Sequence, residues 1–244
     1  MENFQWACDK IIEKARERKG IGTLGEKTIH AVLKEFMEPR EECQEVKVGT
    51  FYADIKNEEG IIEIQSRSFN ALRKKLSYFL EQEKVTIVYP VPYVKWLYWM
   101  NPETGELSKK RKSPKKGTPY EILRELYRIK PFLKHENLSL CIVLMDMEET
   151  RMLNGWSQDK KKGSTRYDRI PTRLEEIITI KTLQDYKKLI PESLKYKKEG
   201  FLVKDYAKAT GLSASKAGTA VNVLREVGAI SLIGKQGKAY VYQA

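Results

Sequence analysis

The fold is decided by the stretch Tyr52-Ala-Asp-Ile-Lys-Asn-Glu-Glu-Gly-Ile-Ile-Glu-Ile-Gln65. Val46 to Ile55 is rich in β-branched and aromatic residues and predicts a strand. Lys56 to Gly60 predicts a polar turn, ending in a residue that adopts positive φ at little cost. Ile61 to Gln65 predicts the returning strand, so we expect a β-hairpin here.

Acidic and amide side chains are expected to converge on this hairpin. Side chains alternate between the two faces of a strand, so Glu63 and Gln65 project together. Asp54 lies near the end of the first strand and can approach Glu63 across the hairpin. Two neighbouring carboxylates repel each other, and a cation between them is the natural compensation. The hairpin therefore predicts a cation-binding site at the rim of a sheet.

This spacing resembles the signature of the PD-(D/E)XK nuclease superfamily, which includes restriction endonucleases and Holliday-junction resolvases. The family pattern is an Asp that ends one strand, followed by Glu-x-Lys on the next strand. Asp54 and Glu63-Ile64-Gln65 occupy those places, while Gln65 replaces the Lys and Ala53 stands where the family name has a proline. The resemblance implies that Asp54, Glu63 and the Ile64 carbonyl bind Mg²⁺, with Mn²⁺ able to substitute. Gln65 would orient the attacking water.

A further acidic residue lies upstream of the hairpin. Lys27 to Phe36 predicts an amphipathic helix with a buried stripe that includes Ile29 and Leu33. Glu26 falls on the same stripe, so we expect it to face the sheet. In the superfamily a Glu on the first core helix often reaches the metal site, which makes Glu26 a candidate ligand and catalytic residue. The alternative is a helix-capping Glu and ordinary surface acids on the strands.

The elements after the hairpin follow the order of the same family. Ser68 to Glu81 predicts a helix, and Val85 to Pro90 predicts a strand buried on both faces. Leu138 to Met145 predicts a second buried strand that completes the sheet. We therefore expect an α/β fold, with a restriction endonuclease-like αβββαβ core and a mixed central sheet over residues 1–198.

Residues 199–244 predict a second, smaller domain. Val203 to Thr210 predicts a short helix, Ser213 is a good N-cap for a helix to about Val227, and a hairpin follows. This resembles a winged helix-turn-helix domain, which implies that the second helix reads bases and the wing meets phosphate. Winged helices also mediate protein contacts, so that role stays open. The candidates are Ser215, Lys216, Thr219 and Asn222 on the helix and Lys235 and Lys238 on the wing.

The formal net charge of +12 favours a polyanionic partner, usually nucleic acid. Two basic loops, residues 109–117 and 154–169, fit contacts with a DNA backbone. The second loop also contains Trp156 and Tyr167. A solvated surface loop is the alternative for each. One candidate for DNA contact, Arg67, lies just after the hairpin. The candidates in the first loop are Lys109, Lys110, Arg111 and Lys112, and those in the second are Lys160, Lys161, Lys162, Arg166 and Arg169.

Composition limits the remaining classes. No apolar run approaches the length of a membrane span, and Met1 to Gly20 has no apolar signal core, so we expect a cytoplasmic protein without a membrane partner. The scattered cysteines, Cys8, Cys43 and Cys141, suit a reducing compartment. Only two histidines are present, which argues against a His-based zinc site.

These observations lead us to expect a Mg²⁺-dependent endonuclease that hydrolyses phosphodiester bonds in DNA, in restriction and defence or in DNA repair. RNA stays open as a substrate, and so does a homodimer, because restriction enzymes and resolvases are often dimers. Because Gln65 stands where the nuclease pattern has a Lys, a second hypothesis stays open. In this hypothesis the chain is a catalytically inactive nuclease fold that binds DNA as a regulator. A charged surface that serves a protein partner is the third.

Overall fold

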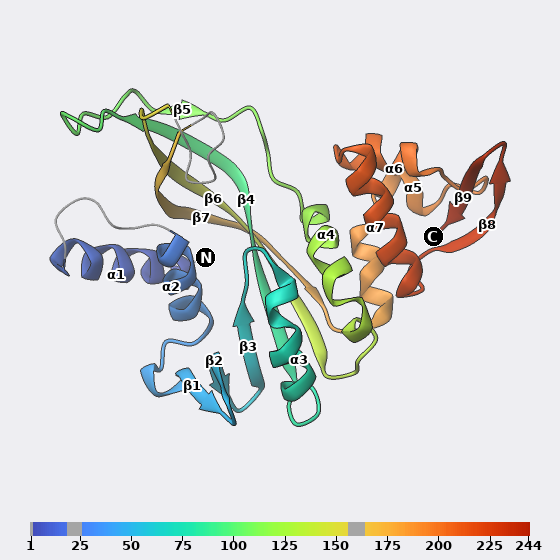
Figure 1. Cartoon of the computed structure of the whole chain (residues 1–244), viewed down its shortest axis with the longest axis horizontal. Coiled ribbons are helices and arrows are strands. Elements are labelled where there is room, and N and C mark those ends of the chain that lie inside the picture. The colour runs from blue at the N-terminus through green and yellow to red at the C-terminus, as the bar shows by residue number, and fades with distance from the viewer. Residues whose placement is uncertain (1, 19–25, 156–163) are drawn as a thin grey trace. The chain divides into compact units, whose positions relative to one another are not determined.

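The computed structural model describes residues 2–18, 26–155 and 164–244 (Figure 1). Within them a seven-stranded sheet has the order β1-β2-β3-β4-β6-β7, with β5 paired to β4, and β8 and β9 form a separate pair. β2 and β3 are antiparallel, whereas β3 and β4 are parallel, so the central sheet is mixed. The strands are β1 (Gln44–Val48), β2 (Phe51–Asn57), β3 (Gly60–Ile64), β4 (Val85–Met100), β5 (Arg111–Lys112), β6 (Leu138–Met152), β7 (Arg166–Ile180), β8 (Ser231–Gln236) and β9 (Ala239–Gln243).

Helices complete the expected αβββαβ order, because α2, β1, β2, β3, α3 and β4 follow one another along the chain. The α/β class with a mixed sheet and a small C-terminal helical and hairpin region is therefore confirmed. No helix in the described parts of the chain has the length and apolar composition needed to cross a bilayer. The helices are α1 (Glu2–Arg18), α2 (Glu26–Met37), α3 (Arg73–Phe79), α4 (Ile122–Leu126), α5 (Glu192–Lys195), α6 (Val203–Thr210) and α7 (Ala214–Glu226), with 3₁₀ segments η1 (Glu41–Cys43), η2 (Phe69–Leu72), η3 (Pro119–Glu121), η4 (Tyr127–Phe132) and η5 (Leu183–Leu189).

Residue contacts divide the chain into two units. The first unit comprises residues 1–46, 90–117 and 143–176, and the second comprises residues 47–89, 118–142 and 177–244. The long strands β4, β6 and β7 contribute residues to both. This division does not follow a boundary at residue 198, and the independence of residues 199–244 as a domain stays a prediction.

In the first unit, α1 packs against α2. The expected apolar stripe of α2 is buried, as Val32 and Leu33 show, and Phe4 of α1 meets Phe36 edge to face with ring centroids 5.2 Å apart. Lys10 and the buried Glu35 form an ion pair between the helices. An amphipathic pattern is thus satisfied by helix-on-helix packing.

Strand β4, at 16 residues, is longer than the sequence predicts. We expected a strand that ends at Pro90, but β4 continues through Pro90 and Pro92 to Met100. Proline cannot donate a ladder hydrogen bond. Because β3 ends at Ile64, opposite Val88, the missing N–H groups leave no gap in the β3 ladder.

In the second unit, the β2–β3 hairpin turns more tightly than expected, since β2 runs to Asn57. Gly60 has φ +125°, and a Cβ there would lie 2.3 Å from the carbonyl oxygen of Lys84. A side chain at this position would therefore clash with the backbone before β4 as well as strain its own. Glycine is required where the hairpin returns beside β4.

The helix after the hairpin is also shorter than expected. Instead of one helix from Ser68 to Glu81, the chain forms η2 and then α3, which runs alongside β3 (Figure 1). Ser68 adopts φ 60°, a left-handed conformation, and the backbone N–H of Phe69 donates to Glu125 of α4 at 3.1 Å. The apolar stripe of this segment is nevertheless buried, including Leu76 and Phe79.

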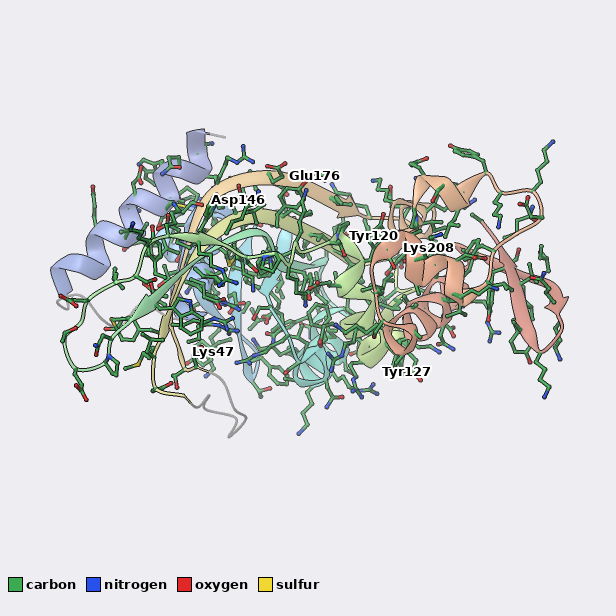
Figure 2. All side chains as sticks on the ribbon, turned by 90° about the horizontal axis from the view of Figure 1, so that it is seen from above. Lys47, Tyr120, Tyr127, Asp146, Glu176 and Lys208 are labelled. Carbon is green, nitrogen blue, oxygen red and sulfur yellow. The ribbon has the colours of Figure 1, made fainter. Side chains whose placement is uncertain are left out.

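The C-terminal helices belong to the second unit and lie beside α4 (Figure 1). Tyr206 of α6 is buried, donates its hydroxyl to the Leu189 carbonyl at 2.8 Å, and packs edge to face on Tyr120, which Figure 2 labels. Ser213 occupies the predicted N-cap position of α7 with an extended backbone, but its side chain makes no capping hydrogen bond. β8 and β9 then form the predicted hairpin.

Candidate functional site

The hairpin register places two carboxylates opposite each other. The paired register ends at Ile55 with Ile62, and if it is continued by one residue on each strand, Asp54 comes opposite Glu63. Directly opposite residues project from the same face of a sheet. The Ile64 N–H donates to Asp54 Oδ2 at 2.7 Å. The N–H and C=O of a strand residue point the same way, so the Ile64 carbonyl also faces the β2 side.

Glu63 is the most deeply buried group of this site, with 2% of its surface exposed. Burial raises its pKa to about 7, and repulsion from Asp54 is the second cause. Lys75 of α3 acts in the opposite direction, because its Nζ donates to both carboxylate oxygens, at 3.0 and 2.9 Å. Burial and repulsion outweigh this ion pair, so Glu63 titrates near neutrality.

Lys75 was missed by the sequence analysis. It is half-buried, whereas its neighbours Arg73 and Lys74 are exposed. The signal was present, because Lys75 follows the buried Leu72 by one helical turn and lies one turn before the buried Phe79. The phase of the apolar stripe therefore turns Lys75 toward the sheet.

The Gln65 amide is engaged with the backbone two residues further along the chain. The Gln65 side chain donates a hydrogen bond to the backbone carbonyl of Arg67. Its own N–H continues the parallel ladder by donating to the Val88 carbonyl at 2.9 Å. Arg67, the basic candidate just after the hairpin, is not on the strand, because β3 ends at Ile64 and Arg67 lies in an exposed bend.

Glu26 is the first residue of α2, and its side chain lies outside the described residues. Its role as a ligand stays a prediction. Among the described residues there is no group of three or more His, Cys, Asp and Glu side chains placed to share one metal ion. Asp54 and Glu63 supply carboxylate oxygens, the ligand type that a hard divalent cation prefers. They offer carboxylate oxygens on one face, and their repulsion contributes to the raised pKa of Glu63.

The first group of basic candidates surrounds the aromatic residues of β4. Arg111 and Lys112 form β5, where Lys112 pairs with Trp96. Lys110 lies 5.1 Å from the Trp96 ring centroid and forms an ion pair with Glu148, while Lys109 is exposed. Lys160, Lys161 and Lys162 lie outside the described residues.

Arg166 and Arg169 lie on β7 rather than in a loop. Both contact the same buried carboxylate, Glu149 of β6, through their Nε atoms at 3.4 and 2.8 Å. They are thus ordered side chains of the first unit.

The C-terminal candidates differ in their surroundings. Ser215 is exposed, and its carbonyl accepts the Thr219 hydroxyl at 3.1 Å, while Lys216 is half-buried. The Asn222 side chain accepts from Lys130 of η4 at 3.0 Å, so this part of α7 is engaged within the protein. On the hairpin, Lys235 lies 5.0 Å from the Tyr240 ring centroid, and Lys238 is exposed in the turn.

Comparison with known proteins gives a family for this chain. Residues 27–181 match the family described as Domain of unknown function (DUF8091). The chain belongs to this family. It is also 30% identical over 228 residues to an uncharacterized protein of Treponema pallidum (strain Nichols), an alignment that covers 91% of this chain and 87% of the relative. No solved structure matches. The family region contains Asp54, Glu63 and Lys75 as well as Glu149.

Proposed function

We propose that this chain is a Mg²⁺-dependent nuclease of the PD-(D/E)XK type that hydrolyses phosphodiester bonds in DNA. The observation that supports it is the paired carboxylates, Asp54 and Glu63, on one face of adjoining strands with Lys75 beside them. The αβββαβ element order and the net charge of +12 agree with it. The C-terminal region, as a winged helix, would place the DNA.

Each residue has a role in this mechanism. Asp54, Glu63 and the Ile64 carbonyl would hold the ion, which when bound polarises the scissile phosphate and lowers the pKa of a water molecule. Water adds to phosphorus as the bond to the leaving oxygen breaks, and the leaving oxygen ends protonated. Lys75 supplies the positive charge that Gln65 cannot, and it would stabilise negative charge on the phosphate. Gln65 would orient the water through hydrogen bonds once its amide leaves the Arg67 carbonyl, to which it donates in this structure.

The direct test is cleavage of supercoiled plasmid DNA with Mg²⁺ or Mn²⁺. Asp54→Asn and Glu63→Gln keep the shape of each side chain and remove its charge, so each should abolish cleavage in a folded protein. Glu59→Gln is the matched control, because this exposed acid lies on the hairpin turn. Wild-type cleavage by either site variant would refute the assignment.

A second candidate is a DNA-binding regulator that does not cut. It is favoured by one observation, that Lys75 already donates to both oxygens of Glu63 and so supplies a cation from within the chain. Under this reading, divalent ions neither bind nor stabilise the protein. Titration of Mn²⁺ into the wild type and Asp54→Asn separates the two, since only a nuclease site should lose affinity in the variant.

A further inference from the structure

The first unit contains a second charged centre, built on one carboxylate. Glu149 of β6 is fully buried. Arg151 approaches its Oε1 through Nε and Nη2, both at 2.6 Å. From β7, Arg169 Nε donates to Oε2 at 2.8 Å, and Arg166 Nε lies 3.4 Å from the same oxygen. Burial acts to raise the pKa of Glu149, but the cations outweigh it and hold the pKa below its ordinary value.

A fourth cation, Lys95 of β4, belongs to the same centre. It feels the charges of Glu149 and of all three arginines. Its ammonium group makes no hydrogen bond or ion pair with another residue in the described part of the chain. Burial lowers the pKa of Lys95, and repulsion from the three arginines lowers it further. The attraction of Glu149 raises this pKa but does not offset the two other effects.

The charge of this centre exceeds what its carboxylate requires. Four cations and one carboxylate sum to 4 − 1 = +3. The bonds from Arg151 and Arg169 already satisfy Glu149. A purely structural ion pair would not gain from Lys95 as well, because the three arginines repel it. Water can reach the cluster, since Arg166 is 42% exposed and Arg151 is 31% exposed.

We propose that Lys95, Arg151, Arg166 and Arg169 form a phosphate-binding centre for the backbone of DNA, and that Glu149 holds its guanidinium groups in place. The planar guanidinium fork matches the geometry of phosphate oxygens. Because Glu149 already fixes the arginine side chains, they lose less conformational entropy when they bind a phosphate. The choice of DNA as the ligand rests on the proposed function. The surplus of positive charge is observed independently of that function. Glu149 is a positioning residue in this arrangement.

The test is the affinity of the full chain for a short labelled DNA duplex, measured by fluorescence anisotropy in EDTA so that nothing is cut. Lys95→Met and Arg166→Gln each remove one charge. One phosphate contact adds about 0.9 to the slope with which the logarithm of the affinity falls against the logarithm of the salt concentration. Between 1 M and 0.1 M salt, that slope corresponds to roughly an eightfold gain in affinity. Each variant should therefore raise Kd about eightfold at 0.1 M salt and flatten the salt dependence by about 0.9.

Arg173→Gln is the matched control, on the same strand β7. Arg173 is 63% exposed and contacts two carboxylates, Asp146 of β6, which Figure 2 labels, and Glu175. Its charge is therefore locally compensated, and its loss should leave Kd within about twofold, as expected for a rim charge of little net effect.

Lys95→Met keeps the proposal testable even if arginine variants unfold. It removes an ammonium group that the cluster repels, so the variant should melt at or above the wild-type temperature. Unchanged Kd for Lys95→Met and Arg166→Gln would overturn the centre. An equal loss in Arg173→Gln would also overturn it, because bulk charge would then explain binding. A failure of the proposed nuclease activity appears separately, as intact plasmid with Mg²⁺ despite normal binding in EDTA.

Discussion

Replacing Glu63 by Gln should remove a pH dependence from the stability of the protein. Glu63 has an ordinary pKa of 4.5, whereas burial and the neighbouring Asp54 raise its pKa to about 7 in the folded state. Between these values the folded protein binds more protons than the unfolded chain. The free energy of unfolding therefore falls as the pH rises toward and through about 7. At about 1.4 kcal/mol per pH unit, the total loss is about 3 kcal/mol.

The amide of Glu63→Gln resembles the protonated acid, which is also uncharged. The variant should therefore match the wild type below about pH 4, where Glu63 is protonated in both the folded and the unfolded chain, and exceed its stability by up to about 3 kcal/mol near pH 8. The ion pair with Lys75 does not change this difference in the free energy of unfolding, because the pKa of about 7 for Glu63 already includes its effect. A bound divalent ion favours the ionised form, so Mg²⁺ at pH 8 should stabilise the wild type and not the variant.

The assay is urea unfolding, followed by tryptophan fluorescence, at a series of pH values in EDTA. Glu59→Gln, on the exposed turn of the same hairpin, should show the wild-type pH dependence. The reasoning is refuted if Glu63→Gln loses stability between pH 5 and pH 8 in parallel with the wild type. That result would mean that Glu63 is solvated, contrary to its burial.

Two further predictions concern neighbours of the site. Lys75→Met should lower the cleavage rate about 10²- to 10³-fold, the cost of losing one preorganised charge-stabilising group, while Gln65→Lys should cleave no faster than the wild type. Plasmid cleavage under identical conditions compares them, and a silent wild type beside an active Gln65→Lys would overturn both statements. Gly60→Ala should destabilise the protein by about 2 kcal/mol or more, because of its φ of +125° and the Lys84 carbonyl. Urea unfolding measures this, and an unchanged midpoint would contradict it.

Much of the site could be predicted from local patterns. Alternation along β2 and β3 fixes which side chains share a face, and the polar turn fixes the hairpin that pairs Asp54 with Glu63. The same kind of local signal gave the start of α7 after Ser213 and the C-terminal hairpin. The sequence pattern predicted a strand end at Pro90, but β4 continues beyond it. A proline interrupts a strand only where its missing N–H group would have donated to a neighbouring strand.

Local sequence patterns therefore account for the hairpin with its two carboxylates, the α/β order around it, and the C-terminal helices and hairpin. Which cation meets which acid depends on packing between distant segments. Lys75 reaches Glu63 because α3 packs beside β3, and Lys95 joins Arg151 and Arg169 because β4, β6 and β7 are neighbours in the sheet. Such pairings depend on packing between segments far apart in the chain, whereas alternation and turn composition act between residues that are close in sequence.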